Sequence, residues 1–582
     1  MGEFLIVGRG PGQKDQVALR NDLRDRAAGE GFALMDLNIH TWLAVRGPHP
    51  PRTLRVADWI LIGDVFDRWR PTIPTVPTGD PLAYERKLMS RLWGRYVGIQ
   101  FHADHSLRAI LRDPSGALEC VAWEQDDLTI VCSSVQDWLI HRLRPGWRIE
   151  PDRVAAALRD PIPATGRLML VGPTALEPST LQPLPLDQQA EVLWSPIEHA
   201  RRSLGPEPSV QEAAATVRSA LDETVRGLAG LPGRSAAEVS GGLDSSIIAA
   251  SLVHAGARPS LWLNAFGPTP ESDERTYVDA LARKLSIKPT SVPHATAPMT
   301  TAWLEGLSPD FRPGLNAMDL PHDLDWADRL GKAGVNSLFT GKGGDSVLFN
   351  RATSDVFIDV WRRSRREALT SADTFELAAS NEVSLWTLIA RARDHARTGT
   401  TCPRRSHPML PPLPGPSPLH PWTRGWDAFG PAKAMHIASL ADNVARHGPS
   451  ALSRTVDLRN PLCAQPVIEA CLALPTSVLT TGGRERGLAR LTFADRLPPE
   501  IVDRRSKGDM TKIYGRMILE GLDVLRPWLL EGRLAALGVI DRAEAEAGLT
   551  REALVWHGRY STIMVAAAFE SWVRSWEKRL AA

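Results

Sequence analysis

The sequence predicts an α/β protein in which an antiparallel α+β domain precedes a doubly wound domain with a parallel sheet and a helical end. Three observations lead to this fold class. The chain has 582 residues, too many for one hydrophobic core. Its first part contains short β-like runs separated by turn signals. From Val210 onward, helices alternate with short apolar strands. We therefore expect two domains, over residues 1–200 and 201–582.

The expected strands of the first domain span residues 59–63, 96–101, 107–111 and 128–132. Between the last two strands, Asp113-Pro114-Ser115-Gly116 has the composition of a tight turn. Short strands joined by such turns favour antiparallel pairing, so we expect a two-layer domain.

In the second domain, residues 260–266 are expected to form a strand, and Ser272-Asp273-Glu274-Arg275 to begin a helix. A further helix over residues 324–333 should lead into a strand at 337–340. The last hundred residues are expected to be helical, and five of their apolar side chains are predicted core: Trp556, Met564, Phe569, Trp572 and Trp576. Eight prolines between Pro403 and Pro421 predict an irregular, solvated insertion.

Composition narrows the possible partners and compartments. The 68 basic and 67 acidic residues give a net charge of +1, which does not favour a nucleic acid or an anionic membrane as the main partner. Five scattered cysteines support neither a disulfide framework nor a zinc site. The apolar run at residues 4–7 is too short for a signal peptide or a membrane span. We expect a cytoplasmic protein.

A glycine-rich loop follows an apolar run at residues 236–239 and precedes a helix-like run at 247–253. Glycines allow the backbone to approach an anion, hydroxyls add hydrogen-bond donors, and a helix start offers free N–H groups. Asp244 is suited to hold the Mg2+ that accompanies a polyphosphate. The predicted phosphate-binding residues of this loop are Val239, Ser240, Gly241, Gly242, Leu243, Asp244, Ser245 and Ser246.

A second glycine-rich loop follows the strand expected at 337–340. Parallel strands end at one edge of a doubly wound sheet, and ligands bind along that edge. Both loops should therefore face the same crevice, with Asp345 as a second carboxylate for Mg2+. The binding residues expected here are Thr340, Gly341, Gly343 and Gly344, with Lys342 as a catalytic candidate.

A third cluster is the basic segment Asp503-Arg504-Arg505-Ser506-Lys507-Gly508. A fixed cation beside the reacting centre stabilises both the departing pyrophosphate and the oxyanion formed when an amine attacks. We assign that role to Lys507. Arg504 and Arg505 are expected to make structural or phosphate contacts.

The first loop, Ser240 to Ser246, resembles the PP-loop of ATP pyrophosphatases, which split ATP into AMP and pyrophosphate. Together with Thr340 to Asp345, Arg459-Asn460-Pro461-Leu462 and Arg505 to Gly508, it resembles the synthetase half of the asparagine synthetase superfamily over about residues 210–575. Segments of the first part, Gly63-Asp64 among them, resemble that family's glutaminase domain. The resemblance implies an Ntn-hydrolase-like first domain and a synthetase domain that uses ATP and Mg2+.

The glutaminase nucleophile of that family is a cysteine directly after the initiator methionine, and here the position is Gly2. Glycine carries no nucleophile, so we expect no ammonia to be made from glutamine and a glutaminase-like domain that is a structural remnant. Branches without this cysteine, β-lactam synthetases and lasso-peptide cyclases, join a carboxylate to an amine already present in the substrate.

Two features resemble the lasso-peptide cyclases. Lys342 stands where asparagine synthetases carry an acidic residue and β-lactam synthetases a tyrosine. The segment from Pro461 to Pro466 has the Pro-Leu-x-x-Gln-Pro form of the cyclases, and Gly487-Leu488-Ala489-Arg490 is similar to their sequence as well. A peptide α-amine has a pKa of about 8, so a useful fraction is neutral at pH 7, which suits attack by a peptide N-terminus.

The resemblance implies a macrolactam synthetase acting on a linear precursor core peptide, with a leader peptidase and a leader-recognition protein as partners. The adenine is expected to pack against the strands that end at Val239 and Phe266. Three alternatives stay open: a β-lactam or other small-molecule amide synthetase, an ammonia-dependent asparagine synthetase, and an inactive scaffold that binds a biosynthetic partner.

Overall fold

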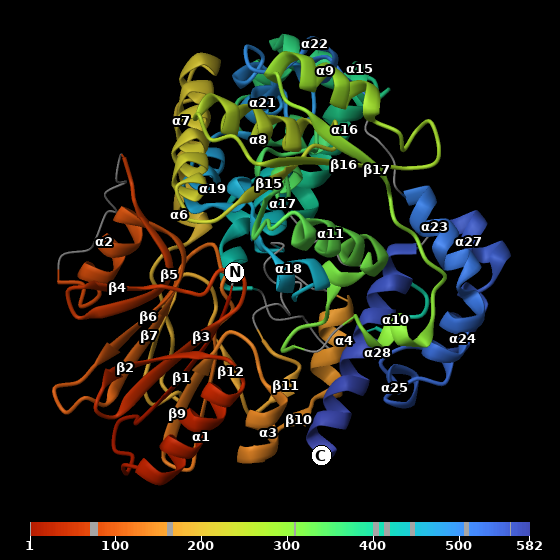
Figure 1. The fold of residues 1–582 in the computed structure, drawn as a ribbon. Helices are drawn as coiled ribbons and strands as arrows, with labels where there is room; N and C mark the ends of the chain where they lie inside the picture. The colour runs from red at the N-terminus through yellow and green to blue at the C-terminus, as the bar shows by residue number, and fades with distance from the viewer. Residues whose placement is uncertain are drawn as a thin grey trace.

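An antiparallel half of the chain lies beside a half built on a parallel sheet (Figure 1). This computed structural model describes residues 2–69, 79–159, 167–307, 310–399, 407–412, 420–442, 448–505, 511–558 and 560–582. The antiparallel strands belong to the red and orange part of the chain in Figure 1, and the parallel strands to the green and cyan part. The arrangement confirms the predicted α/β fold class.

Two antiparallel sheets form the N-terminal half. One sheet contains, in spatial order, β12 (Thr174–Ala175), β8 (Val121–Gln125), β9 (Leu128–Cys132), β1 (Glu3–Gly8), β3 (Thr41–Arg46) and β2 (Ala33–Asn38). The other contains β14 (Glu191–Val192), β13 (Thr180–Pro183), β7 (Leu107–Arg112), β6 (Leu92–Phe101), β5 (Trp59–Asp67) and β4 (Thr53–Val56). A short pair, β10 (Arg148–Ile149) and β11 (Leu170–Val171), completes these strands.

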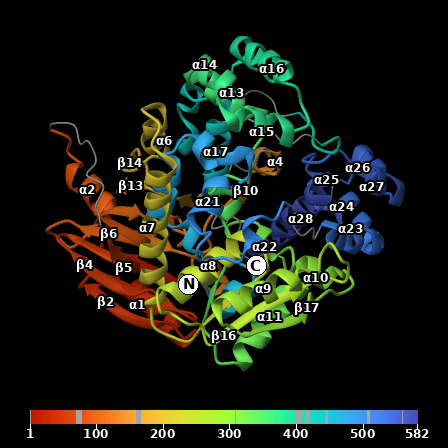
Figure 2. The same ribbon diagram turned by 90° about the horizontal axis from the view of Figure 1, so that it is seen from above.

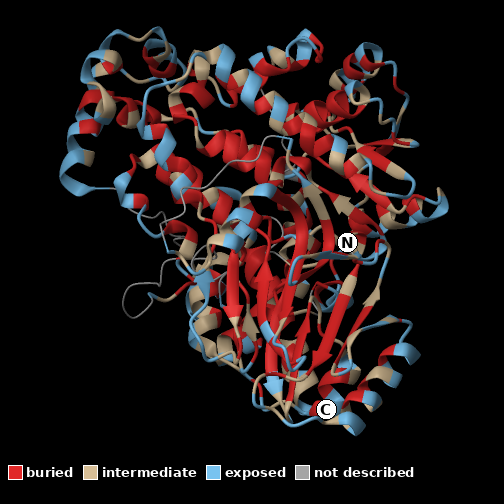
Figure 3. Ribbon diagram, turned by 90° about the vertical axis from the view of Figure 1, so that its left-hand side faces the viewer, coloured by how far each residue is buried: buried red, intermediate tan, exposed pale blue. Residues whose placement is uncertain are grey.

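The alternation of side chains along β1 explains how these sheets pack. Phe4 and Ile6 share a buried core with Ile60 and Ile62 of the other sheet, so the two sheets lie face to face. Leu5 and Val7 point to the opposite face, where helices cover them. Figure 3 shows that the strands of this half are buried over most of their length. The covering helices are α1 (Val17–Gly29), α3 (Asp137–Leu143) and α4 (Pro151–Arg159), while α2 (Ala83–Arg91) packs on Trp59 and Leu61 of the other sheet.

Two strands are longer than expected because glycine permits pairing where the sequence indicates a turn. β5 and β6 remain paired past Gly63 and Gly94, which have positive φ angles of 134° and 153°. A Cβ atom on Gly94 would lie 2.0 Å from the carbonyl oxygen of Asp64, so no other residue fits this close backbone approach.

The parallel sheet has the strand order β17 (Pro289–Pro293), β16 (Leu261–Phe266), β15 (Ser235–Glu238), β18 (Ser337–Phe339) and β19 (Asp457–Arg459). The chain starts in the central strand β15, runs outward to β17, and returns to β18 on the other side of β15. The strand order therefore reverses between β15 and β18. In doubly wound sheets, a ligand crevice opens beyond the carboxyl ends of the strands at such a point.

Helices cover both faces of this sheet, as Figure 2 shows from above. On one face, α7 (Val210–Ala229), α8 (Leu243–His254) and α9 (Arg275–Leu285) pack on Ala237 and Trp262. On the other face, α11 (Leu320–Lys332) and α18 (Ala451–Thr455) pack on Ala236 and Leu263. Neighbouring strand residues thus face opposite layers, which accounts for the short, wholly apolar strands in the sequence.

Most of the remaining helices pack around the parallel sheet or form the C-terminal part. Their bounds are α6 (Pro196–Ala200), α10 (Thr301–Glu305), α12 (Gly344–Val347), α13 (Ser354–Arg363), α14 (Arg365–Thr370), α15 (Ala372–Ser380), α16 (Leu385–Thr398), α17 (Pro431–Ala441), α19 (Gln465–Leu472), α20 (Thr476–Leu479), α21 (Gly487–Thr492), α22 (Pro499–Val502), α23 (Thr511–Glu520), α24 (Leu522–Leu530), α25 (Arg533–Ala536), α26 (Arg542–Gly548), α27 (Arg551–His557) and α28 (Tyr560–Ala581). No helix in the described part of the chain is both long and apolar enough to cross a membrane.

The last helix, α28, ties the C-terminal part to the N-terminal half. Phe569, Trp572 and Trp576 lie in one buried cluster with Trp123 and Trp147 of the N-terminal half. The expectation for Trp556 is wrong: this side chain on α27 is 77% exposed. The spacing of apolar residues predicts that Trp556 lies on a buried helix face. In the structure, the side of α27 that carries Trp556 faces away from the cluster that buries α28.

The proline-rich insertion is also only partly as expected. Most of it lies outside the described residues, which here are 407–412 and 420–421. Within those ranges, Met409, Leu410 and His420 are buried rather than solvated. The guanidinium of Arg159 donates to the carbonyl oxygens of Leu410 and Pro411, so α4 holds this part of the insertion against the core.

A buried ion network joins the antiparallel half to the parallel sheet. Arg95 on β6 donates to Asp64 through Nε at 3.1 Å, and to Asp457 on β19 through Nη1 at 2.9 Å. Asp457 also accepts from Arg459 at 3.0 Å, and His49 Nε2 lies 2.8 Å from Asp64. Burial alone would raise the pKa of Asp457, but the Arg95 charge outweighs it and holds that pKa far below its usual range.

We predict that Arg95→Met destabilises the protein, because it leaves two buried carboxylates without their shared cation. The expected cost is about 3 to 5 kcal/mol, seen as a lower urea midpoint in tryptophan fluorescence. Arg91→Met is the matched control, since its ion pair with Asp67 is exposed to solvent and contributes little to stability. Equal midpoints for the two variants would contradict the prediction.

Candidate active site

The first glycine-rich loop joins β15 to α8 at the carboxyl edge of the parallel sheet. Gly241 has a positive φ of 81°, and a Cβ atom there would lie 2.9 Å from the carbonyl oxygen of Glu274. The hydroxyls of Ser240 and Ser245 share a hydrogen bond of 2.8 Å, which folds the loop around the start of α8. The first turn of a helix presents N–H groups to an anion, so this loop is suited to a phosphate.

The second loop, between β18 and α12, packs directly against the first. A Cβ atom on Gly341 would lie 2.5 Å from the backbone nitrogen of Ser245. One on Gly344 would lie 2.4 Å from Cγ of Asp244. The two loops can approach this closely only because these positions lack side chains. The approach places Asp345, in the first turn of α12, beside Asp244.

Arg486 connects the two carboxylates. Its Nη1 atom donates to Asp244 Oδ2 at 2.8 Å and to Asp345 Oδ1 at 2.7 Å, and its side chain is only 6% exposed. Sequence reasoning missed this residue, which directly precedes α21. A single arginine outside any motif gives no signal of its own, and only the tertiary fold brings it to a sheet edge more than a hundred residues away in sequence.

The carboxylates fit the metal that the sequence implies. Carboxylate oxygens are preferred ligands of Mg2+. One guanidinium nitrogen contacts both Asp244 and Asp345, so the two oxygens lie close enough to share one cation. These two residues would hold Mg2+, and the metal would supply positive charge to a polyphosphate there.

The predicted phosphate-binding residues occupy the two loops and the helix starts that follow them. In the first loop and α8 these are Val239, Ser240, Gly241, Gly242, Leu243, Asp244, Ser245 and Ser246, and in the second loop and α12 they are Thr340, Gly341, Gly343 and Gly344. The structure thus brings both sets together at the reversal of strand order.

Arg504 fixes the first loop from the outside. Its guanidinium lies 3.9 Å from the centre of the Tyr277 ring, and its Nη1 donates to the carbonyl oxygen of Gly241 at 3.3 Å. It also forms an ion pair of 2.5 Å with Glu274. Arg504 therefore has a structural role, one of the two that the sequence suggests. Lys507 lies outside the described residues, so its predicted role stays a prediction.

Lys342, the other catalytic candidate, is exposed on the second loop. Its backbone N–H donates to Thr340 Oγ1 at 3.1 Å, and that hydroxyl donates to Asn460 at 2.6 Å. Burial raises the pKa of Glu238, at the end of β15, while the Lys342 charge partly offsets the shift. The positive charge of Lys342 thus lowers the pKa of an acidic group at the carboxyl edge of the sheet.

The position of the family's cysteine nucleophile has no room for a side chain. A Cβ atom on Gly2 would lie 2.2 Å from the carbonyl oxygen of Arg46 and 2.8 Å from that of His49. The backbone of residues 46–49 therefore occupies the space that a cysteine side chain needs. The glutaminase-like remnant itself stays a prediction.

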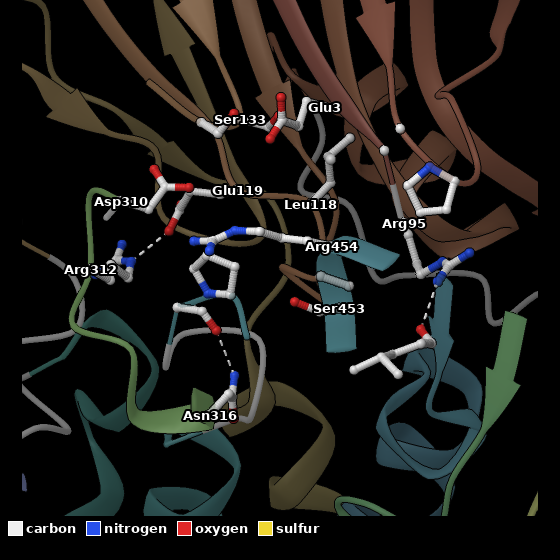
Figure 4. A pocket seen from close by; sticks show the side chains of 18 of the residues that line it. Glu3, Arg95, Leu118, Glu119, Ser133, Asp310, Arg312, Asn316, Ser453 and Arg454 are labelled. Carbon is white, nitrogen blue, oxygen red and sulfur yellow. Dashed lines mark hydrogen bonds and ion pairs between the residues drawn. The ribbon is translucent and has the colours of Figure 1, made fainter. Parts of the chain in front are cut away.

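Beside Gly2 lies a cavity of about 410 Å³ between the two halves of the chain. In Figure 4, Glu3 and Ser133 approach it from the antiparallel sheets, and Asp310, Asn316 and Arg454 approach it from the other side. Burial, with Glu3 nearby, raises the pKa of Asp310 to about 7. The cavity has no lining residue in the two glycine-rich loops.

We predict that Gly344→Ala disrupts the site with little loss of stability, because the new Cβ atom pushes the Asp244 carboxylate out of place. ATP–pyrophosphate exchange should fall about a hundredfold, the usual effect of displacing a reacting group by about 1 Å. Gly331→Ala on α11 is the control, since a Cβ atom there meets nothing within 4 Å. Equal exchange rates in the two variants would contradict this prediction.

The sequence profile of the asparagine synthase family matches residues 216–574, well over half of the chain. The matched region includes both glycine-rich loops, Arg486 and the C-terminal helices. No curated protein matches the chain. The chain belongs to the asparagine synthase family and is an ATP-dependent ligase that forms amide bonds.

Proposed function

We propose that this ligase is a macrolactam synthetase of the lasso-peptide type. The observation that carries the proposal is the combination of two intact glycine-rich loops with a Gly2 position that cannot hold a nucleophile. A chain that activates a carboxylate but makes no ammonia needs an amine supplied with its substrate. A peptide that carries both an acidic side chain and a free N-terminal amine meets that need.

In the proposed reaction, a side-chain carboxylate of Asp or Glu in the linear core peptide attacks the α-phosphorus of ATP. Pyrophosphate leaves, and an acyl-adenylate forms. The N-terminal amine of the same peptide then attacks the acyl carbon, AMP leaves, and an isopeptide bond closes the ring. Proximity within one molecule favours this second step over hydrolysis.

The residues of the site divide these tasks. Backbone N–H groups around Ser240 and at the start of α8 bind phosphate oxygens. Asp244 and Asp345 hold Mg2+, and Arg486 places a cation beside the leaving pyrophosphate. Lys507 stabilises the charge that develops at the reacting centre.

The resemblance to lasso-peptide cyclases further suggests a leader peptidase and a leader-recognition protein as partners in the cytoplasm. These proteins would deliver the linear core peptide. The near-neutral net charge of the chain agrees with a peptide substrate rather than a nucleic acid.

The proposal is tested by AMP and pyrophosphate release from ATP and Mg2+, with and without the candidate core peptide, followed by mass analysis of the peptide. We expect peptide-dependent AMP formation and a product lighter by one water. A peptide whose N-terminal amine is acetylated is the matched control and should not cyclise. ATP turnover with aspartate and ammonia, but not with any peptide, would overturn the proposal.

We also predict that Lys507→Ala lowers the rate of amide formation about a hundredfold, because a charged transition state loses its stabilising cation. Lys332→Ala is the control, since Lys332 is an exposed residue of α11 that forms an ion pair with Asp328. Both rates are measured as AMP release at saturating peptide. An unchanged rate for Lys507→Ala would remove this residue from the mechanism.

A further inference from the structure

A group of buried titratable side chains lies at the same sheet edge as the two loops, beyond β16 and β17. We call it the His294 cluster, and it consists of His294, Asp319, His322, Asp323 and Tyr514. His294 follows β17, and its backbone N–H donates to the carbonyl oxygen of Phe266 at 2.8 Å. Asp319, His322 and Asp323 come from the start of α11, and Tyr514 from α23. None of these side chains belongs to either glycine-rich loop.

Asp319 organises the cluster. His294 Nε2 lies 3.0 Å from Asp319 Oδ2, and the Tyr514 hydroxyl donates to the same oxygen at 2.8 Å. The ring of His322 stacks on that of His294, with centroids 4.4 Å apart and planes inclined by 14°. The His294 side chain is 4% exposed. Contacts on two sides thus hold the His294 ring in one orientation.

Several polar atoms of the cluster are buried and have no hydrogen-bond partner among the described residues. They are Asp319 Oδ1, His322 Nδ1, Asp323 Oδ2 and His294 Nε2, the last of which lies at ion-pair distance from Asp319. Burying such an atom without a partner destabilises the fold. Natural proteins retain few of these atoms, and those that remain call for an explanation, such as a bound ligand or a catalytic role. The described residues offer no cluster of ligands for a metal ion.

The charged groups of the cluster place an anion beside His294. Burial alone would raise the pKa of Asp319, but the contacts with His294 outweigh it and keep that pKa below its usual range. Asp319 is therefore an anion beside His294. Burial lowers the pKa of His322 to about 4 and raises that of Asp323 to about 6. His322 is thus too weak a base near neutral pH.

The His294 cluster lies within the electrostatic influence of Lys342. The Lys342 charge shifts the pKa values of His322 and Asp323 downward, and that of Glu238 as well. The second glycine-rich loop and the start of α11 therefore border one region beyond the carboxyl ends of the strands. In the proposed reaction, the acyl-adenylate is formed in that region.

We propose that His294, paired with Asp319, accepts the proton that the attacking amine loses. This inference rests on the proposed function. The amine nitrogen bonds to the acyl carbon, and the bond from that carbon to the AMP oxygen breaks with its electron pair on the phosphate. His294 takes the proton that the ammonium form of the amine loses before it attacks, and Asp319 stabilises the resulting positive charge. The second amine proton is released to solvent as the amide forms. Tyr514 and His322 keep the pair in position.

The test separates the two half-reactions in His294→Gln. Adenylation is followed by ATP–pyrophosphate exchange, and amide formation by single-turnover loss of the acyl-adenylate. We expect exchange within about twofold of the parent protein and amide formation about a hundredfold slower. The deficit should shrink as the pH rises above about 8, because the amine then loses its proton without the base.

His254→Gln, at the exposed end of α8, is the matched control and should change neither half-reaction. Asp319→Asn should show the same split as His294→Gln, because it removes the charge that stabilises the protonated histidine. An equal loss of both half-reactions in His294→Gln, or a deficit that is constant with pH, would assign His294 a structural role and overturn the proposal. Retained exchange shows that the variant is folded.

The design distinguishes this inference from the proposed function. If the parent protein forms an amide from ammonia or another small amine instead of a peptide, the proposed function fails. The ratio of the two half-reactions is then measured with that amine. A normal ratio in His294→Gln would overturn the inference, and a hundredfold change would support it.

Discussion

The chemistry of this protein depends on the close approach of two glycine-rich loops at the carboxyl edge of the parallel sheet. Gly341 and Gly344 have no room for a Cβ atom, because the backbone of Ser245 and the carboxylate of Asp244 occupy that space. The approach places two carboxylates on either side of one cation. Arg486 forms an ion pair with both, so each of these carboxylates has a cationic partner.

The antiparallel half is joined to the parallel sheet and to the C-terminal helices by buried contacts. The Arg95 network links β6 to β19, and α28 packs on the same half through a cluster of tryptophans. Its predicted nucleophile position, Gly2, is closed by the backbone of residues 46–49. Removal of the antiparallel half would expose the buried faces of β19 and α28.

The edge of the parallel sheet carries two kinds of groups on its two sides. Around β15 and β18, backbone N–H groups, carboxylates and Arg486 suit a polyphosphate and its metal. Around β16 and β17, His294 beside the Asp319 carboxylate suits an amine that must lose a proton. The Lys342 charge lowers the pKa values of groups on both sides, Glu238 at the end of β15 and His322 and Asp323 near β17. This separation agrees with a reaction in which activation of a carboxylate precedes attack by an amine.

The sequence alone determined the α/β class, the two glycine-rich loops and their joint place at one sheet edge, because local periodicity and turn chemistry encode them. It also placed strand β9 at its observed bounds. The continuation of β5 and β6 past Gly63 and Gly94 was decided by pairing, since glycine alone indicates a turn. The sequence also misplaced Trp556, which is exposed, and Met409, which is buried. The burial of a helix face or a loop depends on segments that are distant in sequence. The contacts of Arg486 with two carboxylates and of His294 with Asp319 were likewise decided by tertiary structure. The residues of each pair are separated by tens to hundreds of positions in the sequence, and only the packed sheet brings them within ion-pairing distance.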